Sequence, residues 1–484
     1  MAGIGFELKK LFKKESFSEK AKAYLYSALV SAGPWIAAVL TVNVLILIMD
    51  YIIKRPVEKE LFMGTIVYCF IFSQILTAPW QFLINRYISD CLYLLHYDRI
   101  RPSFLGLNKI VIVLGLIVCI VFYYPKNLPV YYKFLSTYLF LIITMIWIVM
   151  VYLSAVKNYS LIAKAYILGG FISVILTIYF YHKPIPFPEL QSASNLLSAY
   201  LIGMTITYIM LAYTFLSTFY FGSRVEFDFI KYLDNLSSLF FIGLFYTLGL
   251  WIDDIIMWFS IISVTVYDTY LYAPIYDNAV FFAYLTIIPT MVLFLVSVET
   301  EFYDTYKIYY NLVNGSGTLN EIEEARKEMQ ETIIRKTSQS FIIQALISTT
   351  IVFLSRSIFN YFNISILIRD IFRICTFGAL FNIYVLIVIL IFLYFEARGR
   401  ALVVAIVFFV SNVVLTWFFV NKGLEYFGYG FLGGCLLTFI LGLLMLNRFF
   451  HNFNYRTFNF HPIIAKKNNL FFEKLSLYLN KFSA

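Results

Sequence analysis

The sequence predicts an all-α, polytopic membrane protein of about twelve transmembrane helices. Of its 484 residues, 61% are hydrophobic and 13% are charged, whereas soluble domains average about 45–50% and about 25%. The apolar residues gather in charge-poor blocks of about 20, each long enough to cross a hydrocarbon core of about 30 Å as a helix. A soluble protein could not bury this much apolar surface, so lipid surrounds most of the chain.

The charge-poor runs define the expected spans, with ends good to a few residues. They cover residues 26–49, 62–85, 106–124, 134–155, 161–181, 197–221, 236–260, 278–298, 339–358, 374–395, 401–420 and 428–447. Segment 361–372 is the weakest apolar stretch, because Arg369, Asp370 and Arg373 interrupt it. Such a segment could lie along the membrane interface.

The distribution of Lys and Arg gives the orientation, because cytoplasmic loops carry the positive excess. With the N-terminus inside, the cytoplasmic segments hold 27 of the 37 Lys and Arg residues and the outer loops hold the other 10. We therefore expect a multi-pass protein of the plasma (inner) membrane with both termini in the cytoplasm.

The domain organisation follows the spans and the polar stretches between them. We expect a basic amphipathic N-terminal segment at 1–25, an N-terminal lobe at 26–221, a cytoplasmic linker at 222–235, a C-terminal lobe at 236–449 and a basic cytoplasmic tail at 450–484. The C-terminal lobe includes a cytoplasmic loop, 301–336, in which NGSG interrupts two helical stretches. This loop is too short for an enzyme core, so we expect a solvated connector.

The absence of several motifs narrows the function. The formal charge of +9 follows the inward bias of Lys and Arg, and no RNA-binding motif accompanies it, so we expect no nucleic-acid partner. The chain has no GxxxxGK[ST] phosphate loop, its four histidines are far apart and its five cysteines are scattered. We therefore expect no ATP hydrolysis, no metal site, no cofactor and no enzymatic activity.

Asp253 and Asp254 are the strongest candidates for substrate or ion binding, because they lie within the seventh expected span. An ionised carboxylate at depth costs about 2.5–3.5 kcal/mol, so it needs a wet cavity or a cation. Adjacent helical residues diverge by about 100°, so one can face a cavity while the other packs against a span, and we favour Asp253 for the cavity. The alternative is a hydrated pair near the outer rim, with Trp251 and Trp258 as interfacial anchors.

Helix-breaking and aromatic residues supply further candidates. Gly33 and Pro34 in the first span and Pro79 in the second can kink or open their helices, as in transporters whose broken helices gate or line the path. The aromatic candidates lie near a break or a carboxylate and could stack on sugar rings. They are Trp35, Tyr246 and Trp251. The remaining polar groups in or at the ends of spans should bond to neighbouring helices. They are Gln74, Lys164, Gln344, Asn382 and Asn412.

Three stretches carry a resemblance to a known family. They are MAGIGFELKKLFKK at 1–14 with SAGPW at 31–35, GLWIDDIIMWFS at 249–260 leading into APIYDNAVFFAYLTIIPTMVLFLVSVETEF at 273–302, and YFEARGRAL at 394–402. Together they resemble the PelG family of exopolysaccharide exporters. The resemblance implies two six-helix lobes around a central cavity, as in the superfamily of drug and toxin antiporters and of lipid or oligosaccharide flippases.

The resemblance also implies a function and partners. The chain would export a Pel-like exopolysaccharide, an amino-sugar polymer, across the plasma (inner) membrane for biofilm matrix. Its partners would be the polysaccharide chain, a cytoplasmic glycosyltransferase that uses UDP-sugars, a cyclic-di-GMP receptor membrane protein and a scaffold membrane protein. Two alternatives stay open: a cation-coupled small-molecule exporter of the same superfamily, and a membrane glycosyltransferase or polymerase. The short first outer loop, 50–60, which mixes acidic with basic residues, disfavours the second alternative.

Overall fold

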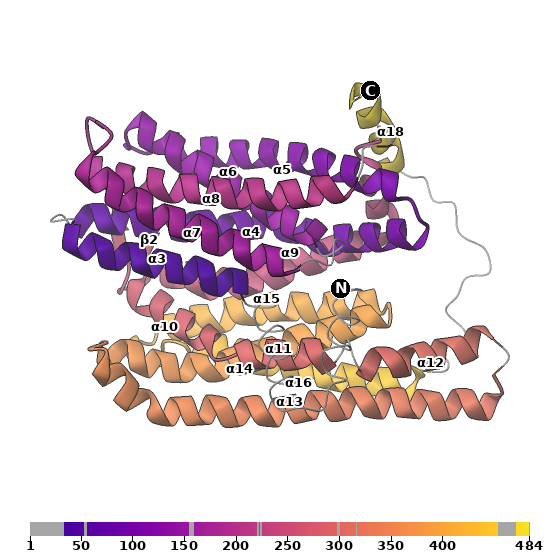
Figure 1. Ribbon diagram of the computed structural model, residues 1–484. Coiled ribbons are helices and arrows are strands. Elements are labelled where there is room, and N and C mark those ends of the chain that lie inside the picture. The colour runs from indigo at the N-terminus through magenta and orange to yellow at the C-terminus, as the bar shows by residue number, and fades with distance from the viewer. Residues whose placement is uncertain are drawn as a thin grey trace, which may run out of the picture. The chain divides into compact units, whose positions relative to one another are not determined.

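The computed structural model describes residues 33–52, 56–153, 159–219, 222, 225–297, 301–315, 317–453 and 471–483. These residues are almost entirely helical (Figure 1). Eleven of their helices are long and apolar enough to cross a membrane, and the shorter apolar helix Ile36–Ile48 lies within the first expected span. The prediction of an all-α polytopic membrane protein is confirmed. The basic segment 1–25 lies outside the described residues.

The helices divide into two compact units. Unit 2 comprises the described residues of 33–251, 258–273 and 471–483, and unit 1 comprises those of 252–257 and 274–453. The expected lobe boundary at 222–235 differs from this division, because the helix that follows it stays with unit 2 up to Trp251. The expected tail, 450–484, also differs, since its terminal helix packs on unit 2.

Unit 2 is a bundle of long helices closed by a small hairpin. Its helices are α3 (Gly33–Ile52), α4 (Pro56–Tyr93), α5 (Ile100–Tyr123), α6 (Val130–Leu153), α7 (Tyr159–His182), α8 (Gln191–Thr218), most of α9 (Tyr232–Met257) and α18 (Phe471–Ser483), with the 3₁₀ turns η1 (Tyr97–Arg99) and η2 (Asp228–Lys231). Strands β1 (Val264–Val266) and β2 (Tyr270–Tyr272) pair antiparallel. The hydroxyl of Tyr68 on α4 accepts from the Leu271 amide at 3.1 Å and donates to its carbonyl at 2.8 Å. The hairpin is thereby fixed to α4.

Small residues bring helices of unit 2 into close contact. A Cβ atom added to Gly203 on α8 would lie 1.9 Å from the Ser173 Oγ and 2.3 Å from the Gly169 carbonyl oxygen, both on α7. Association of helices in lipid depends on this kind of backbone approach, because no hydrophobic force draws apolar helices together there.

Unit 1 holds the other helices. They are the end of α9, α10 (Pro274–Leu285), α11 (Ile288–Ser297), α12 (Tyr303–Asn314), α13 (Leu319–Tyr361), α14 (Ile366–Tyr394), α15 (Arg398–Val420), the 3₁₀ turn η4 (Leu424–Tyr426) and α16 (Tyr429–His451). Helix α14 is the most buried span of the described chain. Helices α15 and α16 approach through Gly430, where an added Cβ atom would lie 2.3 Å from the Thr416 Cα.

The eighth span, expected as one helix over 278–298, is two helices joined at residues 286–287. Pro289, in the first turn of α11, has no amide hydrogen, so the backbone hydrogen bonds of α10 cannot continue through it. Gln344 on α13 replaces part of that ladder, because its Nε2 donates to the Thr286 carbonyl at 2.9 Å and its Oε1 accepts from the Thr290 hydroxyl at 2.5 Å. A side chain from another helix thus compensates the break.

Two connections also differ in detail from the expectation. Residues from Ile366 onward belong to α14, so most of segment 361–372 is continuous with the helix of the tenth span. The Ser365 side chain caps the N-terminus of this helix. Arg373, one of the charged residues that interrupted the apolar run, donates to the Ser355 hydroxyl at 2.7 Å. The expected interruption by NGSG is confirmed, but the helix after it runs without a break from Leu319 into the ninth span. A capping box at Thr318 starts that helix.

Candidate functional site

Asp253 and Asp254 lie in the last turns of α9, near its end at Met257. Their exposed fractions are 0% and 3%, so the expectation of a simply hydrated pair at the outer rim is wrong. Among the described residues, no Lys or Arg forms an ion pair with either carboxylate. The pair is therefore a buried acidic group without a Lys or Arg partner in the described part of the chain.

Asp253 is held by neutral hydrogen-bond donors from two other helices of unit 1. The Tyr276 hydroxyl on α10 donates to its Oδ2 at 2.8 Å, and the Asn412 Nδ2 on α15 donates to its Oδ1 at 3.2 Å. The Asn412 Oδ1 accepts from the Thr416 hydroxyl at 2.9 Å, which sets the orientation of the amide. Both oxygens of Asp253 are thus engaged, and the residue is fixed in place.

Asp254 is bound differently. Its Oδ2 atom is buried and has no hydrogen-bond partner among the described residues. The half-buried side chain of Asp277, one residue after Tyr276 on α10, lies within hydrogen-bonding reach of Asp254. Two carboxylates this close in a water-poor environment cannot both stay ionised without a proton or a cation between them. Asp254 and Asp277, which we call the carboxylate pair, can therefore take up positive charge.

The described residues contain no group of three or more His, Cys, Asp or Glu residues able to hold a metal ion. All five cysteines are buried and free. A proton, a monovalent cation or an ammonium group on a substrate would suit the carboxylate pair.

Two of the aromatic candidates belong to unit 2. Trp251 belongs to unit 2, where its indole Nε1 donates to the Gln74 Oε1 on α4 at 3.0 Å. Tyr246, one turn earlier on α9, is half-buried within the same unit. The side chain of Trp35 lies outside the described residues. Sugar stacking on these three residues stays a prediction.

The expected helix breaks have different outcomes. Helix α4 runs without interruption through Pro79. Gly243 lets α9 pack closely against α4 beside Pro79, since a Cβ atom added to Gly243 would lie 2.2 Å from the Ala78 carbonyl oxygen. Residues Gly33 and Pro34 start the described part of α3, and the side chain of Pro34 lies outside the described residues. A gating role for the three residues stays a prediction. The observed irregularities are Leu236 in α9, with φ −126° and ψ 23°, and the turn at 286–287.

The polar groups expected to bond to neighbouring helices mostly do so. Gln74, Gln344 and Asn412 make the contacts given above. Asn382 is buried on α14, and Lys164 is exposed on α7. Three of these five polar residues therefore bond to a neighbouring helix.

Comparison with known proteins identifies the family. A family model described as "PelG: Putative exopolysaccharide Exporter (EPS-E)" matches residues 1–458. The chain belongs to the PelG family. No curated protein matches it.

Solved structures share the fold of this PelG-family chain. An outward-facing multidrug resistance MATE family transporter of the MOP superfamily has a TM-score of 0.61 at 14% identity, covering 90% of this chain and 97% of that one. A MOP superfamily transporter from Pyrococcus furiosus has a TM-score of 0.56 at 13% identity, with 90% and 96% covered. The bent form of the Vibrio cholerae MATE transporter VcmN has a TM-score of 0.58 at 10% identity, with 90% and 98% covered. The chain thus has the fold of MOP superfamily transporters.

Sequence reasoning missed two residues of the candidate site, Tyr276 and Asp277. Both lie in the stretch that carried the family resemblance, at the start of the eighth span. An Asp in the first turn of a span is ordinarily assigned to capping or to the interface. Only the packing of α10 against the end of α9 gives these residues their place beside Asp253 and Asp254.

Proposed function

We propose that the chain is the membrane subunit that exports a Pel-like exopolysaccharide, an amino-sugar polymer, across the inner membrane for biofilm matrix. The match of the PelG family model to residues 1–458 carries this proposal. The buried acidic group in α9 and α10 supports it, because an exporter of amino sugars needs a place that accepts positive charge.

The carboxylate pair is the proposed site for that charge. An ammonium group on a deacetylated sugar donates up to three hydrogen bonds. The Asp254 Oδ2 has no partner among the described residues and could accept one of them. A proton or a monovalent cation would suit the same place, so the site could serve binding, ion coupling or both. Asp253 acts as a positioning residue, since Tyr276 and Asn412 occupy its oxygens.

The partners are also proposed from the family. A cytoplasmic glycosyltransferase using UDP-sugars would supply the polymer, and a cyclic-di-GMP receptor membrane protein and a scaffold membrane protein would complete the assembly. Both termini would lie in the cytoplasm, as the bias of Lys and Arg predicts.

The test is the substitution Asp254→Asn in a native producer of the polymer. We expect secreted polymer to fall about tenfold or more, while the abundance of the chain in the membrane is unchanged; a lost charge contact in a desolvated site costs about 1.5–3 kcal/mol. Asp370→Asn is the matched control, because Asp370 pairs with Arg369 and Arg373 and its side chain is 50% exposed. Normal secretion from Asp254→Asn at normal abundance would remove the carboxylate pair from the export path.

A cation-coupled small-molecule exporter is the second candidate. The carboxylate pair favours it to the extent that such a pair can bind a proton or Na⁺. Purified chain in vesicles separates the two: ion-driven movement of a drug, together with normal polymer export after deletion of the gene, would support this candidate over polymer export.

A further inference from the structure

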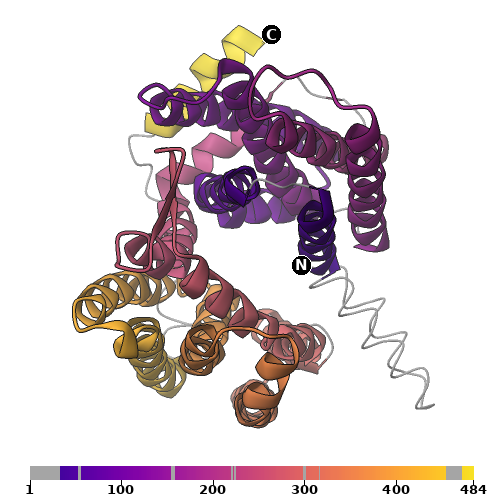
Figure 2. The same cartoon turned by 90° about the vertical axis from the view of Figure 1, so that its left-hand side faces the viewer.

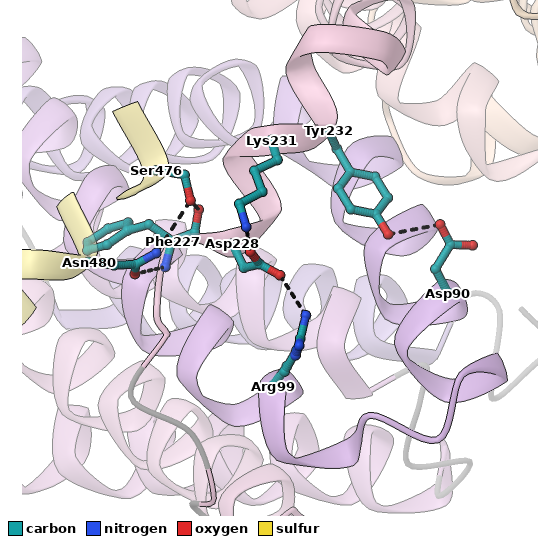
Figure 3. A network of polar contacts seen from close by, with 8 residues as sticks. All are labelled: Asp90, Arg99, Phe227, Asp228, Lys231, Tyr232, Ser476 and Asn480. Atoms are coloured by element: carbon teal, nitrogen blue, oxygen red, sulfur yellow. Dashed lines mark hydrogen bonds and ion pairs between the residues drawn. The ribbon is translucent and has the colours of Figure 1, made fainter. Parts of the chain in front are cut away.

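The C-terminal helix α18 is fixed to unit 2 by specific polar contacts (Figure 3). The Ser476 hydroxyl donates to the Phe227 carbonyl at 2.9 Å, and the Phe227 amide donates to the Asn480 Oδ1 at 2.9 Å. The two oxygens of Asp234 accept from the amides of Phe472 and Glu473, at 3.1 and 2.9 Å. An aspartate at this position satisfies free amides and complements the helix dipole. Helix α18 is therefore a docked element of the fold.

The docking platform lies where two spans begin. Asp228 in η2 pairs with Arg99 at 3.2 Å and with Lys231 at 2.5 Å (Figure 3). Arg99 immediately precedes α5, and η2 leads directly into α9. The hydroxyl of Tyr232 also donates to Asp90 near the end of α4, at 3.0 Å. The ends of three transmembrane helices are tied together directly beneath α18, which places α18 at the level of the membrane surface.

The face of α18 that points away from this platform is apolar and basic. Phe471, Leu477 and Tyr478 have exposed fractions of 68%, 54% and 59%. Lys474 and Lys481 are exposed on the same side, and Glu473 is not. These residues, which we call the α18 stripe, recur at the three- and four-residue spacing of one helix face. Long apolar side chains interleaved with lysines are typical of helices that lie in the lipid headgroup region.

The direction of α18 within unit 2 fits a helix that lies in the lipid headgroup region. Its axis crosses the ends of the bundled helices instead of continuing any of them, and its C-terminal part projects beyond α5 and α6 (Figures 1 and 2). A helix that crosses the ends of transmembrane helices lies along the membrane plane. Leu477, Tyr478 and Lys481 belong to the C-terminal half of this helix and are exposed.

We propose that α18 is an interfacial anchor whose stripe binds the surface of an anionic lipid membrane. The apolar side chains enter the boundary between headgroups and acyl chains, and the aliphatic stems of the lysines extend so that their ammonium groups reach lipid phosphates. Anionic lipid is preferred to a protein partner because the stripe carries two positive charges and no acidic side chain, at the depth where headgroups are present. The anchor holds the loop before α9 against the membrane.

The test uses the full-length chain in nanodiscs of phosphatidylcholine and phosphatidylglycerol. A nitroxide label is attached to the new cysteine of the Leu477→Cys variant. The label reacts selectively with this cysteine because the native cysteines are buried. Power saturation of the nitroxide signal measures how often each relaxing reagent collides with the label. Oxygen concentrates in lipid and therefore reports lipid exposure, whereas a water-soluble nickel chelate reports exposure to solvent. Val414→Cys, exposed on the apolar helix α15, gives the lipid reference, and Glu328→Cys, exposed on α13, gives the water reference.

We expect the label at Leu477 to be more accessible to oxygen than to nickel, as at Val414. Lys474→Gln with Lys481→Gln should lower the ratio of membrane-bound to free α18 about 30-fold, because each near-surface lysine contributes about 1 kcal/mol on anionic lipid. These substitutions leave the contacts of Ser476, Asn480 and Asp234 intact.

Three results would overturn the proposal. Nickel accessibility at Leu477 equal to that at Glu328 would place the stripe in water. Protection from both reagents would place it against protein, either a partner or a second copy. A depth that is the same in pure phosphatidylcholine and unaffected by the lysine substitutions would exclude recognition of anionic lipid.

Discussion

Replacing Gln344 with leucine should loosen the broken eighth span. The substitution removes the bonds to the Thr286 carbonyl at 2.9 Å, to the Thr290 hydroxyl at 2.5 Å and to the Ser348 hydroxyl at 3.0 Å. Two of these bonds join different helices, and such bonds in membranes average about 0.6 kcal/mol each; with a similar value for the bond to Ser348 within α13, the loss is about 2 kcal/mol. The Thr286 carbonyl, which lies in the turn between α10 and α11, then loses its Gln344 partner.

The assay is the melting midpoint of the purified chain in detergent, followed by size-exclusion chromatography after heating. We expect a decrease of about 4–8 °C, since about 1 kcal/mol corresponds to about 2–4 °C in a folded unit of this size. Ser348→Ala removes one of the three bonds and should lower the midpoint by about a third as much. Because α10 also carries Tyr276 and Asp277, polymer export should fall as well. A midpoint for Gln344→Leu within about 1 °C of the native value would refute the assignment of Gln344 as the residue that bridges the break.

Two further outcomes follow from close contacts in the structure. Tyr276→Phe removes one donor to Asp253, worth about 1 kcal/mol, so we expect secreted polymer to fall several-fold at normal membrane abundance; Tyr361→Phe, on an exposed side chain, is the control, and equal secretion from both variants would contradict the role of Tyr276. Gly203→Leu places a Cβ atom 1.9 Å from the Ser173 Oγ, and such overpacking costs about 1–3 kcal/mol or more, so less monodisperse protein should be recovered. Gly399→Leu has no atom within 4 Å of its added Cβ, and equal recovery of the two leucine variants would argue against close packing of α7 and α8.

Residue patterns predicted the spans well because each depends on local composition. A block of about 20 apolar residues must be helical in lipid, where every backbone group has to find its bond within the segment. The patterns failed where other helices decide the outcome. The break at 286–287 is tolerated because Gln344, more than fifty residues later, supplies bonds to both sides of it. The charges at Arg369 and Arg373 suggested an interfacial segment, but Asp370 and Ser355 partner them in a regular helix.

The candidate site was predicted in part. A carboxylate within a span is expensive unless it is partnered, and this alone selected Asp253 and Asp254. The packing of α10 and α15 against α9 decides the different roles of the two residues. It fixes Asp253 through its neighbours and leaves Asp254 able to accept positive charge. Sequence favoured Asp253 as the residue facing a cavity, whereas the structure occupies both of its oxygens and leaves one oxygen of Asp254 without a partner among the described residues.

The sequence by itself determined that this chain is a helical membrane protein, which orientation its charges favour, and which family its motifs resemble. These properties depend on local hydrophobicity and on residue identity. The tertiary structure alone decided the pairing of Asp254 with Asp277, the bridging of the eighth span by Gln344 and the docking of α18 on Phe227 and the start of α9. Each depends on hydrogen bonds between segments far apart in the chain, and side-chain hydrogen bonds act only between groups that packing has brought to within about 3 Å.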